Sequence, residues 1–191
     1  MAVREVLEIG HPVLMSRAEE VDPNRIQSAE VQGWIDDMID TMRHANGAGI
    51  AANQIGIPYR LFVIEISDNP RYPYKPKVPL TVVINPRIRV LSDEIFTSNE
   101  GCLSVPQIRG NVTRHLEIEV EYFDRNGVEH KEVIKGYSAC TWQHEADHLD
   151  GVLFPHRVED QRSITSWKVF KEFNEPEYAK HVEALVAKWG A

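Results

Sequence analysis

The segment Gln143-His144-Glu145-Ala146-Asp147-His148 carries the strongest local signal in this sequence, and residues 137–149 around it are predicted to be helical. In a helix, side chains four positions apart lie on one face, with about 5–6 Å between their Cβ atoms. His144 and His148 can therefore reach one cation, whose bonds to imidazole nitrogens are about 2.0–2.1 Å long. Glu145 flanks the open position of such an ion and can take a proton from water. The motif therefore predicts a hydrolytic metal site.

A catalytic site of this kind needs a third protein ligand. The H-E-x-x-H pattern also arises by chance, and two histidines can simply lie on a solvated helix face. Upstream, Cys102 lies in Glu100-Gly101-Cys102-Leu103-Ser104, where a glycine lets the backbone approach a metal or a substrate closely. A lone cysteine is more often an inert core residue, but next to two histidines that lack a third donor Cys102 is the favoured ligand. Cys140 is the alternative: as a fourth ligand it would close the open position and make the site structural.

Periodicity along the chain predicts an α+β fold. Residues 28–45 carry an apolar stripe at helical spacing, and Asn46-Gly47 supplies a stop. Apolar runs and strict alternation predict strands at 59–66, 81–84, 116–122 and 128–134, with a proline-rich loop at 68–80, a turn at Asn126-Gly127 and a last helix at about 177–189. Because the strands are mostly consecutive, we expect antiparallel or mixed sheets packed around the central motif helix, between an N-terminal and a C-terminal helix.

Composition fits a single domain over residues 1–191, because 42% of the residues are apolar. The net charge of −8 disfavours a protein that grips phosphate backbones, so no specific DNA binding is expected. Two cysteines, no signal-peptide pattern and no long apolar run indicate a bacterial-type cytoplasmic protein without a membrane span. An organellar matrix is the alternative if a transit peptide is removed.

The run Gly47-Ala48-Gly49-Ile50-Ala51-Ala52-Asn53-Gln54 is too rich in glycine to be the middle of a helix or a strand. It follows a helix, so it lacks the strand-to-helix setting of a dinucleotide loop. Two interpretations remain. The run is either a tight turn packed against the core, or a place where small residues leave space for a substrate that receives a hydrogen bond from the Gln54 amide.

Three blocks occur together and in order: G-x-G-x-A-A-x-Q at 47–54, E-G-C-L-S at 100–104 and Q-H-E-x-D-H at 143–148. Together they resemble the peptide deformylase family over roughly residues 4–160. The resemblance implies removal of the formyl group from the N-terminal methionine of nascent polypeptides, with release of formate. It also implies one divalent metal per chain on Cys102, His144 and His148, iron(II) for which nickel, cobalt or zinc can substitute.

The resemblance further implies the catalytic roles. Glu145 takes the proton of the attacking water and hands it to the leaving amine. The Gln54 amide, the Leu103 N–H and the metal hold the oxyanion. The peptide is expected to lie extended along the backbone of Gly47, Ala48, Gly49 and Gly101, with Arg109 holding it and Thr141 lining the methionine pocket. The alternative for Arg109 is an exposed arginine without a role in substrate binding. Family members often carry a larger aliphatic residue at the position of Ala48, so a wider pocket is an open question here.

Two rival functions share parts of this pattern. A zincin-type peptidase would use the same helix, but it usually draws its third ligand from downstream, where no candidate stands in a convincing context. A non-enzymatic binding module would have no need of Glu145. The N-formylmethionyl nascent peptide is therefore the expected partner, and the sequence leaves open whether the C-terminal helix docks transiently on the ribosome. We expect the remaining histidines, 11, 44, 115, 130, 156 and 181, to be ordinary surface residues.

Overall fold

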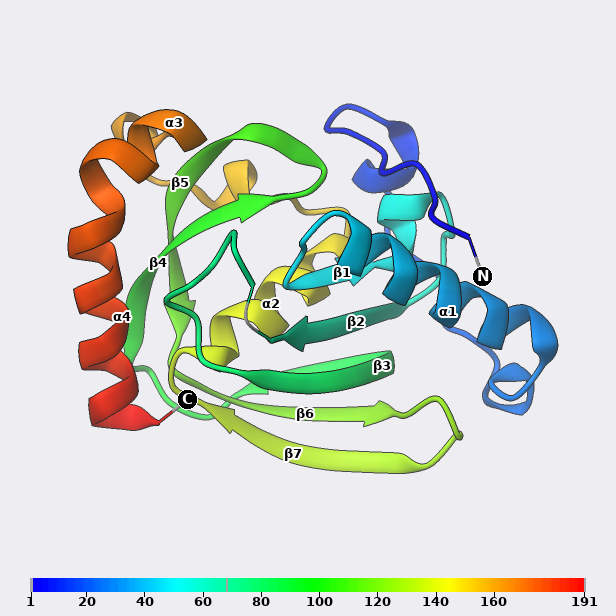
Figure 1. Ribbon diagram of the computed structural model, residues 1–191. Helices are drawn as coiled ribbons and strands as arrows, with labels where there is room; N and C mark the ends of the chain where they lie inside the picture. Colours follow the sequence, from blue (N-terminus) through cyan, green and yellow to red (C-terminus); the bar gives the residue numbers. More distant parts are fainter. Residues whose placement is uncertain (1, 68, 191) are drawn as a thin grey trace.

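The computed structural model describes residues 2–67 and 69–190, and its first long element is helix α1, Ala29–His44 (Figure 1). Ser28 caps it, since its side-chain oxygen accepts a hydrogen bond from the Val31 N–H at 3.3 Å. The helix ends where Asn46 takes a positive φ of 51°, a conformation that asparagine tolerates. The predicted apolar stripe is buried against the first sheet.

That sheet has five antiparallel strands in the order β1-β2-β3-β6-β7. Their bounds are β1 Gly49–Ala51, β2 Leu61–Ile66, β3 Val78–Val90, β6 Glu117–Phe123 and β7 Glu129–Lys135. Successive side chains of β2 point to opposite faces, so Leu61 and Val63 pack against α1 while Phe62 and Ile64 pack against the motif helix. The sheet thus separates the two helices.

The motif helix α2, Ser138–Leu149, lies between this sheet and a second one. The second sheet is antiparallel, in the order β4-β5-β8, with β4 Ile95–Cys102, β5 Val105–His115 and the short β8 Thr165–Ser166. Two edge strands therefore lie near the motif helix: β1 from the first sheet and β4 from the second. Short 3-10 turns connect the elements at 12–15, 23–25, 52–55, 154–157 and 161–163.

The C-terminal segment runs along β4 and β5 (Figure 1). It consists of α3 Trp167–Val169, one π-helical turn Phe170–Asn174 and α4 Glu175–Trp189. The apolar side of α4 packs on Phe96 and Leu116, as its amphipathic pattern predicts. No helix among the described residues is long and apolar enough to cross a membrane.

The predicted α+β class is confirmed, and the structure differs from the predicted elements in three places. Residues 95–115 form the long β4–β5 hairpin, which the periodicity did not indicate. Strand β3 starts at Val78, inside the predicted proline-rich loop, and continues to Val90. Gly49–Ala51 is a strand rather than an irregular turn, because its backbone pairs with Phe62–Ile64 of β2. Pairing in the sheet outweighs the low strand preference of glycine there.

Candidate metal centre and active site

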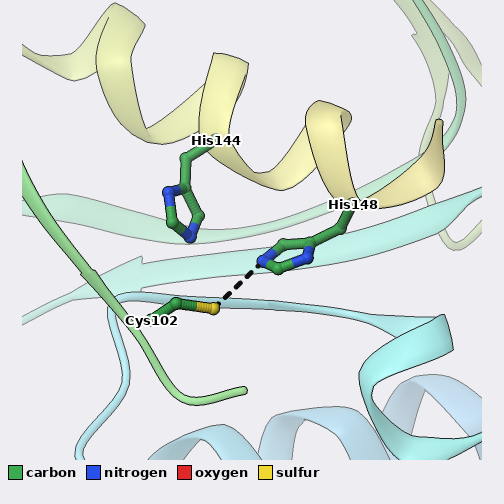
Figure 2. A group of neighbouring side chains, drawn as sticks. All are labelled: Cys102, His144 and His148. Carbon is green, nitrogen blue, oxygen red and sulfur yellow. Dashed lines mark hydrogen bonds between the residues drawn. The ribbon is translucent and has the colours of Figure 1, made fainter. Parts of the chain in front are cut away.

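Cys102, His144 and His148 meet between the end of β4 and one face of α2 (Figure 2). One ligand atom of each residue lies within 4.8 Å of the other two. The Cys102 Sγ is 3.3 Å from the His148 Nε2. Within the described residues this is the one group of three such side chains close enough to share an ion, and Cys140 is not part of it. The structural-site alternative, which needs Cys140 as a fourth ligand, therefore has no geometric support.

The donor set fits a divalent transition metal. A thiolate and two imidazoles are ligands that such ions prefer, and three protein ligands leave one position for water or substrate. The Nδ1 of His144 lies 2.8 Å from a Glu100 carboxylate oxygen, so this contact fixes the ring and leaves Nε2 for the ion. Burial lowers the pKa of His148 well below its usual value, which favours the neutral form that binds metals.

The Glu100 partner of His144 belongs to a buried chain of ion pairs. Arg114 donates to both oxygens of Glu100, at 2.8 and 2.9 Å, and its third nitrogen reaches Asp147 at 2.6 Å. Burial alone would raise the pKa of Glu100, but Arg114 and His144 outweigh it and hold that pKa far below its usual value. Glu100 is therefore ionised and can orient the ligand imidazole. Sequence periodicity gave no sign of this pairing, because β4 and β5 supply its two members.

Glu145 lies on the same helix with its carboxylate enclosed by protein. Its side chain is buried, and in the described part of the chain its Oε2 has no hydrogen-bond partner. Burial raises its pKa to about 7. A carboxylate with a pKa near neutrality, and with one oxygen unpartnered, is suited to accept a proton from water and to return it.

Gln54 reaches the same site from the 3-10 turn that follows β1. Its side-chain oxygen accepts from the Ala51 N–H at 2.8 Å, which fixes the orientation of the amide. Its nitrogen donates to the Ser104 hydroxyl at 3.0 Å and lies 3.5 Å from Cys102 Sγ. The amide nitrogen carries two hydrogens: one donates to Ser104, and the other donates to the Cys102 Sγ and so is directed at the ligand side chains.

A cavity opens beside the three ligand residues, between the edge strands β1 and β4. It is lined by all the residues that the sequence predicted to bind substrate, and by three that the sequence did not single out, Tyr72, Lys75 and Asn99. The full lining is Gly47, Ala48, Gly49, Gln54, Tyr72, Lys75, Asn99, Glu100, Gly101, Cys102, Leu103, Arg109, Cys140, Thr141, His144 and Glu145. Ala48 packs with Tyr72 in one apolar cluster, so the Tyr72 ring lies in the space beside this small residue.

A comparison with protein families finds the polypeptide deformylase model, matched by residues 3–163. This chain belongs to the polypeptide deformylase family. It is 46% identical over 163 residues to the peptide deformylase of Leptospira biflexa, an alignment that covers 85% of this chain and 91% of that one. The family is metal-dependent, so the chain is a metallo-hydrolase, and neither a peptidase of the zincin type nor a non-enzymatic module.

Solved deformylase structures share the fold. The Met-Ala-Ser-bound class I type b enzyme of Acinetobacter baumannii superposes with a TM-score of 0.79 at 38% identity, covering 82% of this chain and 99% of that one. The enzyme of Synechococcus elongatus, in complex with actinonin, gives a TM-score of 0.74 at 32% identity and covers 97% of this chain and 85% of that one. The second comparison extends over the C-terminal segment.

The histidines outside the deformylase motif are not all on the surface. His11, His44, His156 and His181 are exposed, as predicted, whereas His115 and His130 are half-buried. His130 stacks on Tyr122 and lies 3.2 Å from Asp124, a pairing across a hairpin that the sequence pattern does not reveal. None of the six contributes to the metal-binding group.

Proposed function

We propose that this deformylase removes the formyl group of N-formylmethionyl nascent peptides at an ion held by Cys102, His144 and His148. The convergence of these three donors beside an enclosed Glu145 carries the proposal. When bound, the divalent ion would act as a Lewis acid that makes water more acidic and polarises the formyl carbonyl. Iron(II) is the proposed ion, with nickel, cobalt or zinc able to replace it.

The chain's own residues supply the remaining steps. Glu145 accepts a proton from the attacking water, whose oxygen forms the new bond to the formyl carbon. The second amide hydrogen of Gln54 and the Leu103 N–H donate to the carbonyl oxygen as it gains negative charge. When the carbon–nitrogen bond breaks, Glu145 gives its proton to the leaving amine. The products are formate and a peptide with a free N-terminal amine.

The peptide would lie extended between β1 and β4. Both are edge strands with unpaired backbone groups, and Gly47–Gly49 and Gly101 line the cavity between them. An added strand can pair with such edges. Thr141 and Ala48 would border the methionine side chain, and Arg109 would hold the peptide backbone. The bacterial relatives support a cytoplasmic location, and transient docking of α4 on the ribosome is a question that the sequence leaves open.

The experiment is formate release from formyl-Met-Ala-Ser by protein purified without oxygen, with ferrous ion supplied and metal content measured. Rapid, chelator-sensitive release with one metal per chain is expected. The variant Glu145→Gln should keep the metal and lose roughly 10²–10⁴-fold in kcat. Metal binding without formate release would contradict the proposed substrate, and a fully active Glu145→Gln variant would contradict the proposed proton transfer.

A further inference from the structure

Residues of the C-terminal segment pack against the side chain of Arg109. Its side chain is fully buried, and its guanidinium carbon is 4.2 Å from the ring centre of Trp167 and 4.2 Å from that of Phe170. Its Nε donates to the Asn99 side-chain oxygen at 2.7 Å, and its Nη2 donates to the Asn99 carbonyl at 2.6 Å and to the Tyr74 hydroxyl at 3.0 Å. These contacts fix the guanidinium in one orientation.

One donor of this guanidinium has no acceptor. Among residues 2–67 and 69–190, nothing accepts a hydrogen bond from Nη1, although the atom is buried. No carboxylate among these residues forms an ion pair with Arg109. The two aromatic faces and the three hydrogen bonds therefore offset the unfavourable burial of its charge. A buried donor without an acceptor is unfavourable. Arg109 also lines the cavity, so Nη1 can be satisfied by an acceptor on a ligand there.

Trp167 also touches the edge strand along which the peptide would lie. A Cβ atom on Gly101 would stand 3.0 Å from the Trp167 ring, which shows that the ring rests on the Gly101 backbone. Gly101 and Arg109 are cross-strand partners in the β4–β5 pair. The Trp167 side chain therefore contacts both Gly101 and Arg109, the two residues of this strand pair that are expected to hold the peptide. The indole Nε1 of Trp167 is a second buried donor with no acceptor among the described residues.

The family match ends at residue 163, before Trp167 and Phe170. We infer that these two residues of the C-terminal segment are positioning residues for substrate: they clamp the Arg109 guanidinium so that its Nη1 donates to a backbone carbonyl of the formyl-peptide. The inference rests on the proposed function. It adds that substrate binding by this deformylase depends on a segment that follows the residues matched by the family model.

A double-mutant cycle tests the clamp, with KM and kcat for formyl-Met-Ala-Ser measured on the metal-loaded full chain. Trp167→Ala should raise KM roughly tenfold, with kcat changed by less than about threefold, because the aromatic face orients Arg109 and takes no part in the chemistry. Trp167→Phe should restore most of the lost affinity. In an Arg109→Lys background, which lacks the guanidinium fork, Trp167→Ala should raise KM no further.

The matched control is Trp189→Ala, which removes a half-buried tryptophan at the end of α4 whose ring lies beside Lys135 and Lys188 and makes no cation–π contact with Arg109. It should leave KM unchanged. The clamp would be overturned if the effects of Trp167→Ala and Arg109→Lys on KM are fully additive, that is, if Trp167→Ala raises KM equally in both backgrounds. It would also be overturned if Trp167→Ala lowers kcat and leaves KM unchanged. If Trp167→Ala fails to fold, the same cycle with Trp167→Leu answers the question, because leucine also removes the aromatic face. Absence of formate release by the unmodified chain would instead contradict the proposed function.

Discussion

Gly49 lies directly against Glu145. A Cβ atom added at Gly49 would stand 2.5 Å from the Oε1 of Glu145 and 2.7 Å from its carboxyl carbon. Such contacts are too short to exist, so the carboxylate would have to move. The absence of a side chain at Gly49 is thus what allows β1 to pass beside the proposed proton acceptor.

Gly49→Ala should therefore displace the Glu145 carboxylate and lower kcat/KM for formyl-Met-Ala-Ser roughly hundredfold, since small misplacements of reacting groups cost about that much. Metal content should be unchanged, because the three proposed ligands are untouched. Gly33→Ala is the control: nothing lies within 4 Å of a Cβ there, and it is an α1 position. It should keep full activity and add about 0.5–1 kcal/mol to the free energy of unfolding. Equal activities of the two variants would contradict the assigned contact.

The Glu100–Arg114 pair predicts a coupling between stability and metal affinity. Arg114→Met leaves a buried carboxylate without its cation, which should cost about 3–5 kcal/mol of the free energy of unfolding. Glu100→Gln should weaken metal binding about 10–100-fold through loss of the His144 contact. Chemical denaturation and metal titration measure the two effects. The exposed pair Arg89–Glu119, at 3.0 Å, provides the control, and Arg89→Met should change stability by less than about 1 kcal/mol.

The lowered pKa of Asp37 on α1 predicts that the free energy of unfolding depends on pH. Burial raises its pKa, but hydrogen bonds from Arg4 and from the Ala2 N–H outweigh burial, and the net pKa lies below its usual value. A carboxyl with a lowered folded-state pKa stabilises the fold above its unfolded pKa of about 3.9, and this contribution is lost as the pH falls through the folded value.

Asp37→Asn should therefore cost about 1–3 kcal/mol at neutral pH. The difference from the unmodified chain should shrink as the pH is lowered from about 5 toward 2, through the unfolded and then the folded pKa of the carboxyl. Urea unfolding at a series of pH values gives this difference directly. A gap that stays constant across that range would show that the Asp37 carboxylate does not titrate with folding.

The proposed Cys102 ligand predicts different lifetimes for different metals. A ferrous ion next to a thiolate is open to oxidation of the metal or of the sulfur. The iron form should lose activity in air faster than the nickel or zinc form, and mass spectrometry of the inactivated protein should reveal whether Cys102 carries added oxygen. Identical half-lives for the three forms would contradict this expectation. Removal of the metal should also lower Tm, because an ion that binds only the folded state stabilises it.

Local sequence determined much of this protein. The four-residue spacing of His144 and His148 fixes both rings on one face of a helix wherever that helix lies. The stripe of α1 and the alternation in β6 likewise predict their elements, because one buried face imposes one period. Three motifs far apart in the chain also indicated, by resemblance, the family to which the comparisons assign it.

Only the tertiary structure decided the rest. Strand β4 buries polar side chains, Ser98 and Glu100, on its alternate positions, so it lacks the apolar alternation that reveals a strand. The Glu100 carboxylate is stable in the interior because Arg114, from another strand, pairs with it. The Trp167–Arg109 contact joins residues 58 positions apart, 167 against 109, and no local period encodes it. Periodicity reports which face of an element is apolar, whereas the partner of a buried polar group is set by how separate elements pack.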